Sequence, residues 1–133
     1  MTGVLPAGVE FAAFWRERRL CTVTTLRPDG SPPVVPMGVV LDPATGTAWA
    51  ITSGRSRKAA NIRAAGPDGA LFAACQVDGR SWSTVEGRAV VLDDPDSVRE
   101  AERRYAERYK VPRENPDRVA VRVTVSRVLG NVR

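Results

Sequence analysis

The stretch RVAVRVTVSRVL, residues 118–129, decides the fold class of this protein. Valine stands at every second position from Val119 to Val125, and the residues between them are polar or small. Because successive side chains of a β-strand point to opposite faces, this alternation indicates one face in the core and one face toward solvent. The stretch therefore predicts a half-buried antiparallel strand.

Other segments predict five further strands and three helices around this one. The expected strands cover residues 20–26, 33–41, 47–52, 70–77 and 82–92, and the expected helices cover a segment after Pro6, residues 56–65 and residues 94–109. Hairpin-type turns connect them, which excludes a doubly wound parallel sheet. With no repeat or linker, we expect one domain over residues 1–133. It is mainly β with about three helices, arranged as a six-stranded antiparallel barrel.

The expected strand 33–41 contains two residues that weaken a strand. Pro36 has no N–H group to donate to a neighbouring strand, and Gly38 adds no side chain to the packing. The combination predicts an edge strand, a bulge, or a place where a ligand lies against the backbone.

The composition excludes several kinds of chemistry. The 133 residues include no histidine, which rules out Ser-His-Asp and Cys-His catalysis and histidine-containing zinc sites in their usual forms. The two cysteines, Cys21 and Cys75, are too few for a metal site, and their apolar surroundings predict buried thiols. No apolar run approaches the ~20 residues of a membrane span, and no secretory signal is evident. We therefore expect a cytoplasmic protein without a metal ion.

The stretch ITSGRSRKAANI, residues 51–62, is the strongest local signal for a binding site. No acidic residue occurs between positions 42 and 68, and four basic residues do: Arg55, Arg57, Lys58 and Arg63. Cations at the start of a helix meet the positive end of its dipole, so this pattern indicates an anion, most simply a phosphate. It is equally typical of a solvated basic helix face, and the residues alone leave both interpretations open. A positive charge confined to one segment does not favour a nucleic-acid partner.

Several motifs resemble one known family. Residues 56–59 (SRKA) follow a strand and a Thr-Ser turn, as in the phosphate-binding element of the pyridoxamine-phosphate-oxidase-like split β-barrels, and residues 84–89 (TVEGRA) resemble a later strand of that family. The order of strands, helices and turns agrees along the chain. Within this family the sequence is most similar to the actinobacterial enzymes that use the deazaflavin coenzyme F420, above all the F420-dependent biliverdin reductases. Residues 20–27, 31–35, 58–61, 76–79, 98–106 and 127–130 carry that likeness.

The resemblance implies a split β-barrel in which the cofactor carries the hydride, so no catalytic side chain is expected. The residues implied around the phosphate are Arg57 and Lys58, with Thr52, Ser53, Gly54 and Asn61 beside them. The residues implied along the deazaflavin ring are Val35, Pro36, Met37 and Gly38. Gln76 and Trp82 are expected nearby, Trp82 more as a core or dimer contact.

The resemblance also implies a reaction and its partners. Reduced F420 would transfer a hydride to biliverdin, giving bilirubin, or to a related conjugated substrate. Ser-Arg-Lys is also typical of flavin mononucleotide (FMN) binders, so an FMN-dependent oxidase or reductase stays open, and a non-enzymatic cofactor- or tetrapyrrole-binding protein is a third possibility. Members of the family are homodimers, so we expect a homodimer with a small-molecule substrate and with neither nucleic acid nor membrane as a partner.

Overall fold

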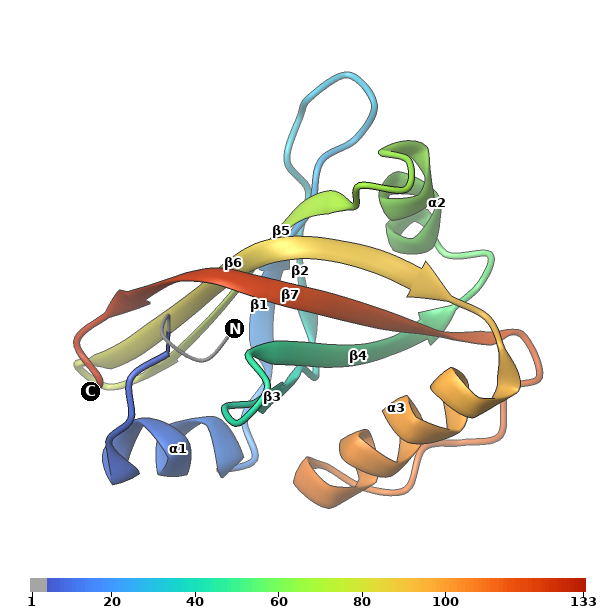
Figure 1. Ribbon diagram of the computed structural model, residues 1–133. Coiled ribbons are helices and arrows are strands. Elements are labelled where there is room, and N and C mark those ends of the chain that lie inside the picture. Colours follow the sequence, from blue (N-terminus) through green and yellow to red (C-terminus); the bar gives the residue numbers. More distant parts are fainter. Residues whose placement is uncertain (1–4) are drawn as a thin grey trace.

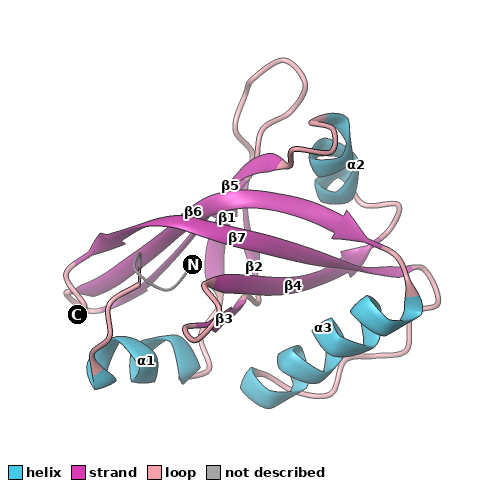
Figure 2. Ribbon diagram, in the orientation of Figure 1, coloured by secondary structure: helices cyan, strands magenta, loops and turns pink. Residues whose placement is uncertain are grey.

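Residues 5–133 are described by a computed structural model, and all their strands belong to one sheet (Figure 1, Figure 2). Every pair of neighbouring strands is antiparallel, as predicted. The strands are β1 (Cys21–Thr24), β2 (Val34–Met37), β3 (Val40–Asp42), β4 (Thr47–Ser53), β5 (Ala70–Asp78), β6 (Ser81–Leu92) and β7 (Arg118–Gly130). The helices are α1 (Val9–Arg16), α2 (Arg57–Ala64) and α3 (Pro95–Arg108).

The alternating stretch forms β7, which pairs with β6 on one side and with β4 on the other. Its alternate valines, Val119, Val121, Val123 and Val125, are buried in the core. Arg122 lies between two of them and is exposed. The prediction of a half-buried antiparallel strand is therefore confirmed.

The sheet is curled because its two edge strands follow each other directly in the chain. The strand order is β2-β1-β5-β6-β7-β4-β3, so β2 and β3 lie at opposite edges. Only Gly38 and Val39 separate the end of β2 from the start of β3. Three Cα–Cα steps reach at most about 11 Å, so the two edges must come together. The sheet thus closes on itself as a split barrel.

This closure corrects the predicted strand count. The sequence predicts one strand over residues 33–41, whereas the structure divides it into β2 and β3 and so has seven strands within residues 5–133. At the division, the backbone of Val39 is bonded by side chains of the α3 segment. Its N–H donates to Tyr109 Oη (3.1 Å), and its carbonyl accepts from Arg108 Nη1. The predicted edge position of Pro36 is confirmed, because β2 is an edge strand.

The helices take different places on the sheet. α1 and α3 lie on the same side of it, and α2 lies apart from them, beside the loop between β1 and β2 (Figure 1). α1 places Phe11 and Trp15 in the core. Asp94 caps α3 by accepting from Ser97 N (3.0 Å), with Pro95 in its first turn, as predicted. No helix in the described part of the chain has the length and hydropathy that crossing a lipid bilayer requires.

Candidate functional site

The start of α2 presents hydrogen-bond donors that have no acceptor of their own. Thr52, in β4, donates from Oγ1 to Ser56 Oγ (3.0 Å), and Ser56, the N-cap, also accepts from Ala59 N (3.1 Å). A hydroxyl accepts two hydrogen bonds and donates one, so Ser56 keeps its own proton for a further acceptor. The N–H groups of Arg57 and Lys58 stand in the first turn, where no intrahelical acceptor exists.

Two of the four cations in this segment are held by the protein, and two are not. Arg55 Nε lies 3.5 Å from Asp117 Oδ2, and Arg63 Nη1 donates to a backbone carbonyl of the preceding turn (2.8 Å). Within residues 5–133, the side chains of Arg57 and Lys58 have neither a hydrogen bond nor an ion pair, and the first turn of α2 has no acidic residue. Two uncompensated cations therefore stand at the positive end of the helix dipole.

This donor set fits a phosphate group. Phosphate oxygens accept hydrogen bonds from hydroxyl, N–H and charged donors together, and free N–H groups at a helix start bind anions. The sequence alone left open whether this segment is an anion site or a solvated basic face. The unused proton of Ser56 beside two unpaired cations favours the anion site.

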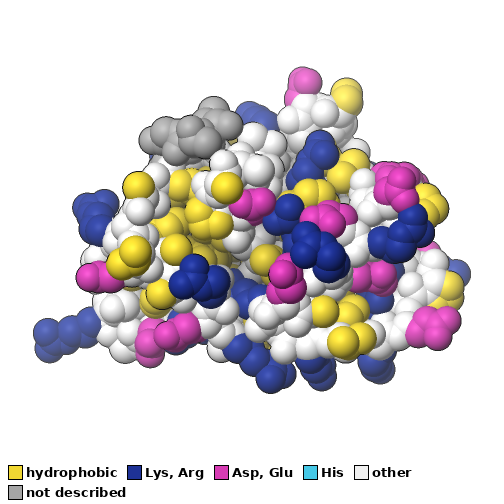
Figure 3. Space-filling model, turned by 60° about the horizontal axis from the view of Figure 1, so that its bottom comes forward, with side chains coloured by type: hydrophobic (Ala, Val, Ile, Leu, Met, Phe, Trp, Pro, Cys, Tyr) yellow, Lys and Arg dark blue, Asp and Glu magenta, His cyan; other side chains and the backbone are white. Residues whose placement is uncertain are grey.

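Several basic residues of α3, by contrast, pair with carboxylates. On the side that carries α1 and α3, basic and acidic side chains are interspersed (Figure 3). Arg103, for example, pairs with Glu100 (2.7 Å), and Arg104 pairs with Asp42 (3.1 Å). Arg99, Arg103 and Arg104 of α3 are thus matched by neighbouring carboxylates, in contrast to Arg57 and Lys58 at the start of α2.

The turn before α2 is held by Asp117, a residue that sequence analysis missed. Ser53 Oγ donates to Asp117 Oδ2 (2.8 Å), and Gly54 N donates to the Asp117 carbonyl (2.7 Å). The hydroxyl proton of Ser53 is therefore used inside the protein, which changes its predicted role from phosphate contact to support of the turn. Asp117 follows α3 in the chain, far from this turn in sequence, so no local motif indicates it.

Side chains of the protein fill part of the space beside residues 35–38, the segment predicted to lie along the cofactor ring. A Cβ at Gly38 would stand 2.9 Å from ring carbons of Tyr105 and of Tyr109. Two tyrosine rings therefore fill the space that a side chain at position 38 would take, and the contact of residues 35–38 with the cofactor ring stays a prediction. Of the four residues, Pro36 is exposed, Met37 is buried, and Val35 and Gly38 are half-buried.

Gln76 is buried inside the barrel. Its Oε1 accepts from Arg108 Nη2 (2.7 Å), and its Nε2 donates to the Phe14 carbonyl (2.7 Å). The side chain is 1% exposed and is directed into the core, so a contact of Gln76 with the cofactor ring stays a prediction. Strand parity could have indicated the inward direction, since Gln76 shares its parity in β5 with the buried residues Phe72 and Ala74.

Asn61 and Trp82 lie in different surroundings. Asn61, in α2, is 5% exposed, and its Nδ2 has no hydrogen-bond partner within the described chain. It lines a pocket of about 410 Å³ together with Arg27 and Arg88. A buried amide without a partner is costly, so Asn61 suits a site that supplies an acceptor.

Trp82, at the start of β6, is 39% exposed and so is not a core residue.

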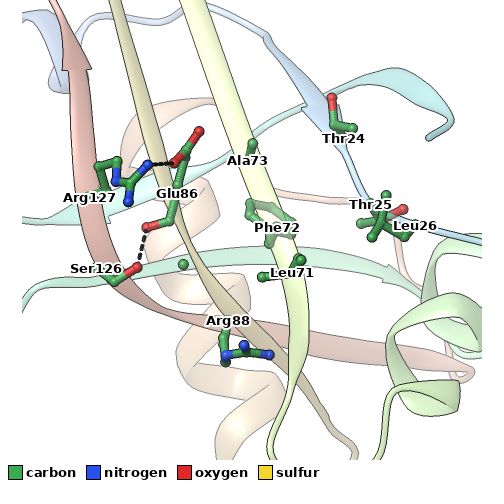
Figure 4. Close-up of a pocket in the computed structure, with 11 residues that line it drawn as sticks. Thr24, Thr25, Leu26, Leu71, Phe72, Ala73, Glu86, Arg88, Ser126 and Arg127 are labelled. Atoms are coloured by element: carbon green, nitrogen blue, oxygen red, sulfur yellow. Dashed lines mark hydrogen bonds and ion pairs between the residues drawn. The ribbon is translucent and has the colours of Figure 1, made fainter. Parts of the chain in front are cut away.

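The solvent-facing side of β5, β6 and β7, here called the outer face, is hollowed. Its trough has a volume of about 490 Å³ and is lined by Arg88 and by Arg127, whose guanidinium lies 3.9 Å from Glu86 (Figure 4). Large apolar side chains are exposed on the same face: Leu71, Val77, Trp82 and Leu129. Apolar side chains gathered on one face are typical of a surface that another molecule covers.

Comparisons with known proteins show what this chain is similar to. A family model described as pyridoxamine 5'-phosphate oxidase matches residues 8–131. A curated protein of Mycobacterium tuberculosis (strain CDC 1551 / Oshkosh), an F420H(2)-dependent biliverdin reductase, is 50% identical over 119 residues, which cover 90% of this chain and 84% of that protein.

Solved structures share the fold. A conserved hypothetical protein of Mycobacterium tuberculosis, Rv2991, superposes with a TM-score of 0.77 at 23% identity, over 99% of this chain and 88% of that one. An F420 reductase superposes with a TM-score of 0.71 at 23% identity, over 94% of this chain and 98% of that one. These likenesses confirm the predicted split β-barrel.

Proposed function

The chain belongs to the pyridoxamine 5'-phosphate oxidase family, and on that premise we propose that it transfers a hydride from reduced coenzyme F420 to biliverdin, giving bilirubin. The observation that carries the proposal is the 50% identity, over 90% of the chain, to an F420H(2)-dependent biliverdin reductase. The donor set at the start of α2 is compatible with the proposal, because that set fits the phosphate of a cofactor.

In this proposal the start of α2 holds the cofactor by its phosphate. Lys58 contributes a point charge and Arg57 a planar fork of donors. Ser56 donates its free proton, while Thr52 keeps the Ser56 hydroxyl oriented by donating to it (3.0 Å). Asn61 lies one turn further along the helix, with an amide that needs an acceptor. These residues bind and orient the cofactor and take no part in the chemistry.

The remaining residues position the reacting groups. Reduced F420 supplies the hydride when it is bound. We propose that the edge strand β2 borders the deazaflavin ring through Pro36 and its half-buried neighbour Val35. A two-electron reduction also requires a proton, and the chain has no histidine to donate it. We therefore assign proton delivery to water or to the pyrrole groups of the substrate.

We propose that the enzyme is a homodimer formed through the outer face. Leu71 and Val77 of β5 are 54% and 60% exposed, and Leu129 of β7 is 42% exposed. Burying such side chains against a second copy removes apolar surface from water. A twofold contact uses the same patch on both copies, so one apolar face is enough.

The test combines binding with turnover. Purified protein is titrated with oxidised F420 by fluorescence and then mixed anaerobically with F420H2 and biliverdin. We expect saturable binding and bilirubin formed in equal amount to the F420H2 consumed. Turnover with reduced FMN in place of F420H2, and none with F420H2, would overturn the proposal in favour of the flavin alternative. Binding of F420H2 without oxidation by any bilin would leave a cofactor-binding protein.

A further inference from the structure

The turn between β4 and α2 is fastened to the loop that precedes β7 through one residue, Asp117. Asp117 Oδ2 accepts from Ser53 Oγ (2.8 Å) and from Arg55 N (3.2 Å). The backbone carbonyl of Asp117 accepts from Gly54 N (2.7 Å). Three consecutive residues of the turn are therefore held by one residue from elsewhere in the chain.

Asp117 is itself held in place by its own loop. Its N–H donates to Asn115 Oδ1 (3.0 Å), and Arg118 N donates to the Asn115 carbonyl (3.1 Å). Arg118 in turn pairs with Glu102 of α3 (2.8 Å). An Asn side chain that bonds the backbone two residues onward makes a compact turn, so the carboxylate of Asp117 is presented from a fixed support.

The turn has little freedom to adopt another conformation. A Cβ at Gly54 would lie 3.0 Å from the Asp117 carbonyl oxygen and 3.3 Å from Val119 Cγ1, so glycine lets the two loops approach. Arg63, in the last turn of α2, donates to the Gly54 carbonyl from the other side (2.8 Å). The N–H and the carbonyl of Gly54 are thus tied to the loop before β7 and to α2.

The ion pair between Asp117 and Arg55 is not the reason for this arrangement. The side chain of Arg55 is 89% exposed, and its Nε lies 3.5 Å from the carboxylate. Exposed pairs of this kind contribute little to stability. The two shorter contacts go to Ser53 and to the backbone of Arg55, and these determine how the chain enters the N-cap.

We propose that Asp117 is a positioning residue of the cofactor site: it sets the turn 53–55, which aims the hydroxyl of Ser56 and the first N–H groups of α2 at the phosphate. This inference rests on the proposed function, because it assigns the phosphate to F420. The direction in which the affinity changes when Asp117 is replaced distinguishes positioning from charge. A carboxylate near an anion site repels the anion, so removing it would strengthen binding if charge alone mattered.

Three variants separate positioning from charge. Asp117→Ala removes the acceptor and the charge, whereas Asp117→Asn keeps an amide oxygen that can take the place of Oδ2. Asp68→Ala removes a carboxylate from the turn after α2 and is the matched control for net charge. Each variant is tested for affinity toward oxidised F420, for KM and kcat with F420H2, for melting temperature, and for hydrogen exchange of the Arg55 amide without ligand.

We expect Asp117→Ala to raise the Kd for F420 about tenfold, the change that corresponds to 1.4 kcal/mol. Its KM for F420H2 should rise in parallel while kcat at saturating coenzyme stays near that of the wild type, because the residue acts on binding geometry. Asp117→Asn should stay within about threefold, since neutral hydrogen bonds are roughly half as strong as charge-assisted ones. Asp68→Ala should change none of these values.

Hydrogen exchange tests the contacts between Asp117 and residues 53–55 in the absence of any cofactor. The amide of Arg55 should lose its protection in Asp117→Ala and keep it in Asp117→Asn. Unchanged or tighter F420 binding by Asp117→Ala would overturn the inference while leaving the proposed function intact. A lower melting temperature of Asp117→Ala with an unchanged Kd for F420 would also overturn the inference and leave the proposed function intact.

If wild-type protein binds no F420, the proposed function fails. Inorganic phosphate, followed through the Arg57 and Lys58 amide signals, then replaces F420 in the same comparison. Equal phosphate shifts in wild type and Asp117→Ala would overturn the inference.

Discussion

Arg108 of α3 donates a 2.7 Å hydrogen bond from Nη2 to Oε1 of Gln76 in β5, inside the barrel. Arg108 is 7% exposed and has no carboxylate partner within residues 5–133. Its Nε donates to the Glu17 carbonyl (3.0 Å), and its guanidinium lies 5.6 Å from the ring centre of Trp15. The charge is thus met by neutral acceptors and an aromatic face, which compensates the cost of burying it. One side chain ties α3 to α1 and to β5.

Loss of this side chain should destabilise the fold. Arg108→Met keeps most of the volume but leaves the buried carbonyl oxygens without donors. We expect the free energy of unfolding to fall by about 2–4 kcal/mol, as for the loss of a buried network. Urea denaturation measures the change. Arg103→Met, on the exposed side of the same helix, should cost less than about 1 kcal/mol. Equal costs at the two positions would contradict a structural role for Arg108.

Gly38 should not tolerate a side chain. Its Cβ would stand 2.9 Å from the rings of Tyr105 and Tyr109. Overpacking of this kind costs about 1–3 kcal/mol, so Gly38→Ala should lower the midpoint of denaturation. In a Tyr105→Ala background the same substitution should cost at least about 0.5 kcal/mol less, because the two sites are in contact. Strictly additive effects in this double-mutant cycle would show that the Tyr105 ring is not the obstacle.

Lys58→Ala should weaken cofactor binding without harming the fold. A lost charge-assisted contact costs about 1.5–3 kcal/mol, which corresponds to a roughly ten- to hundredfold higher Kd for F420. The unliganded protein should be as stable or slightly more stable, because a cation is removed from the positive end of a helix. Lys110→Ala is the matched control, as it removes the only other lysine of the chain. Fluorescence titration with F420 gives both affinities, and a similar loss for both variants would indicate a diffuse field.

Stability should fall at alkaline pH. Burial raises the pKa of the Cys21 thiol from 9.0 to about 11, against the opposing charge of Arg108, and burial also raises the pKa of Tyr109 to about 12. Between the ordinary and the folded pKa of Cys21, the unfolded chain has released a proton that the folded chain retains. The free energy of unfolding therefore decreases with rising pH there. The contribution of Cys21 is complete below about pH 9 and is lost by about pH 11.

Urea unfolding between about pH 8 and pH 10.5 tests this dependence. In that window one retained proton corresponds to a slope of up to about 1.4 kcal/mol per pH unit. Cys21→Ala lacks the titrating thiol, so its stability should decline less steeply than that of the wild type. Parallel declines would mean that Cys21 titrates at its ordinary pKa in the folded protein.

The outer face should hold two chains together. Light scattering should give about 29 kDa, twice the 14.4 kDa of the chain. Leu71→Asp, in the exposed apolar surface, should shift the mass toward the monomer at micromolar concentration. Val111→Asp introduces the same charge at a side chain that is 81% exposed in the loop after α3, and it should leave the mass unchanged. A monomeric wild type would remove the dimer from the proposal.

Elements whose signals are local could be predicted closely. The alternation of β7 depends only on the two-residue repeat of an extended chain. The starts of α2 and α3 follow from Ser56 and Asp94, which accept from N–H groups three residues onward. Each of these interactions closes within one turn, so the residue types alone indicate them.

The candidate site could be predicted only in part, for the same reason. Arg57 and Lys58 follow the strand and the turn directly, and their charge is evident from composition. Asp117 is 64 residues from Ser53, and Tyr109 is 70 residues from Val39. Such partners are brought together by the curl of the sheet, which no local pattern encodes.

The sequence by itself determined an antiparallel barrel with helices, and it determined which segment gathers four cations without an acidic residue. Only the tertiary structure decided that residues 33–41 break into two edge strands, that Gln76 points inward to Arg108, and that Ser53 serves the turn rather than the ligand. The physical reason is the range of the interactions. Periodicity and capping act over two to four residues, whereas a buried hydrogen bond or a filled space depends on whichever distant side chain the closed sheet places beside it.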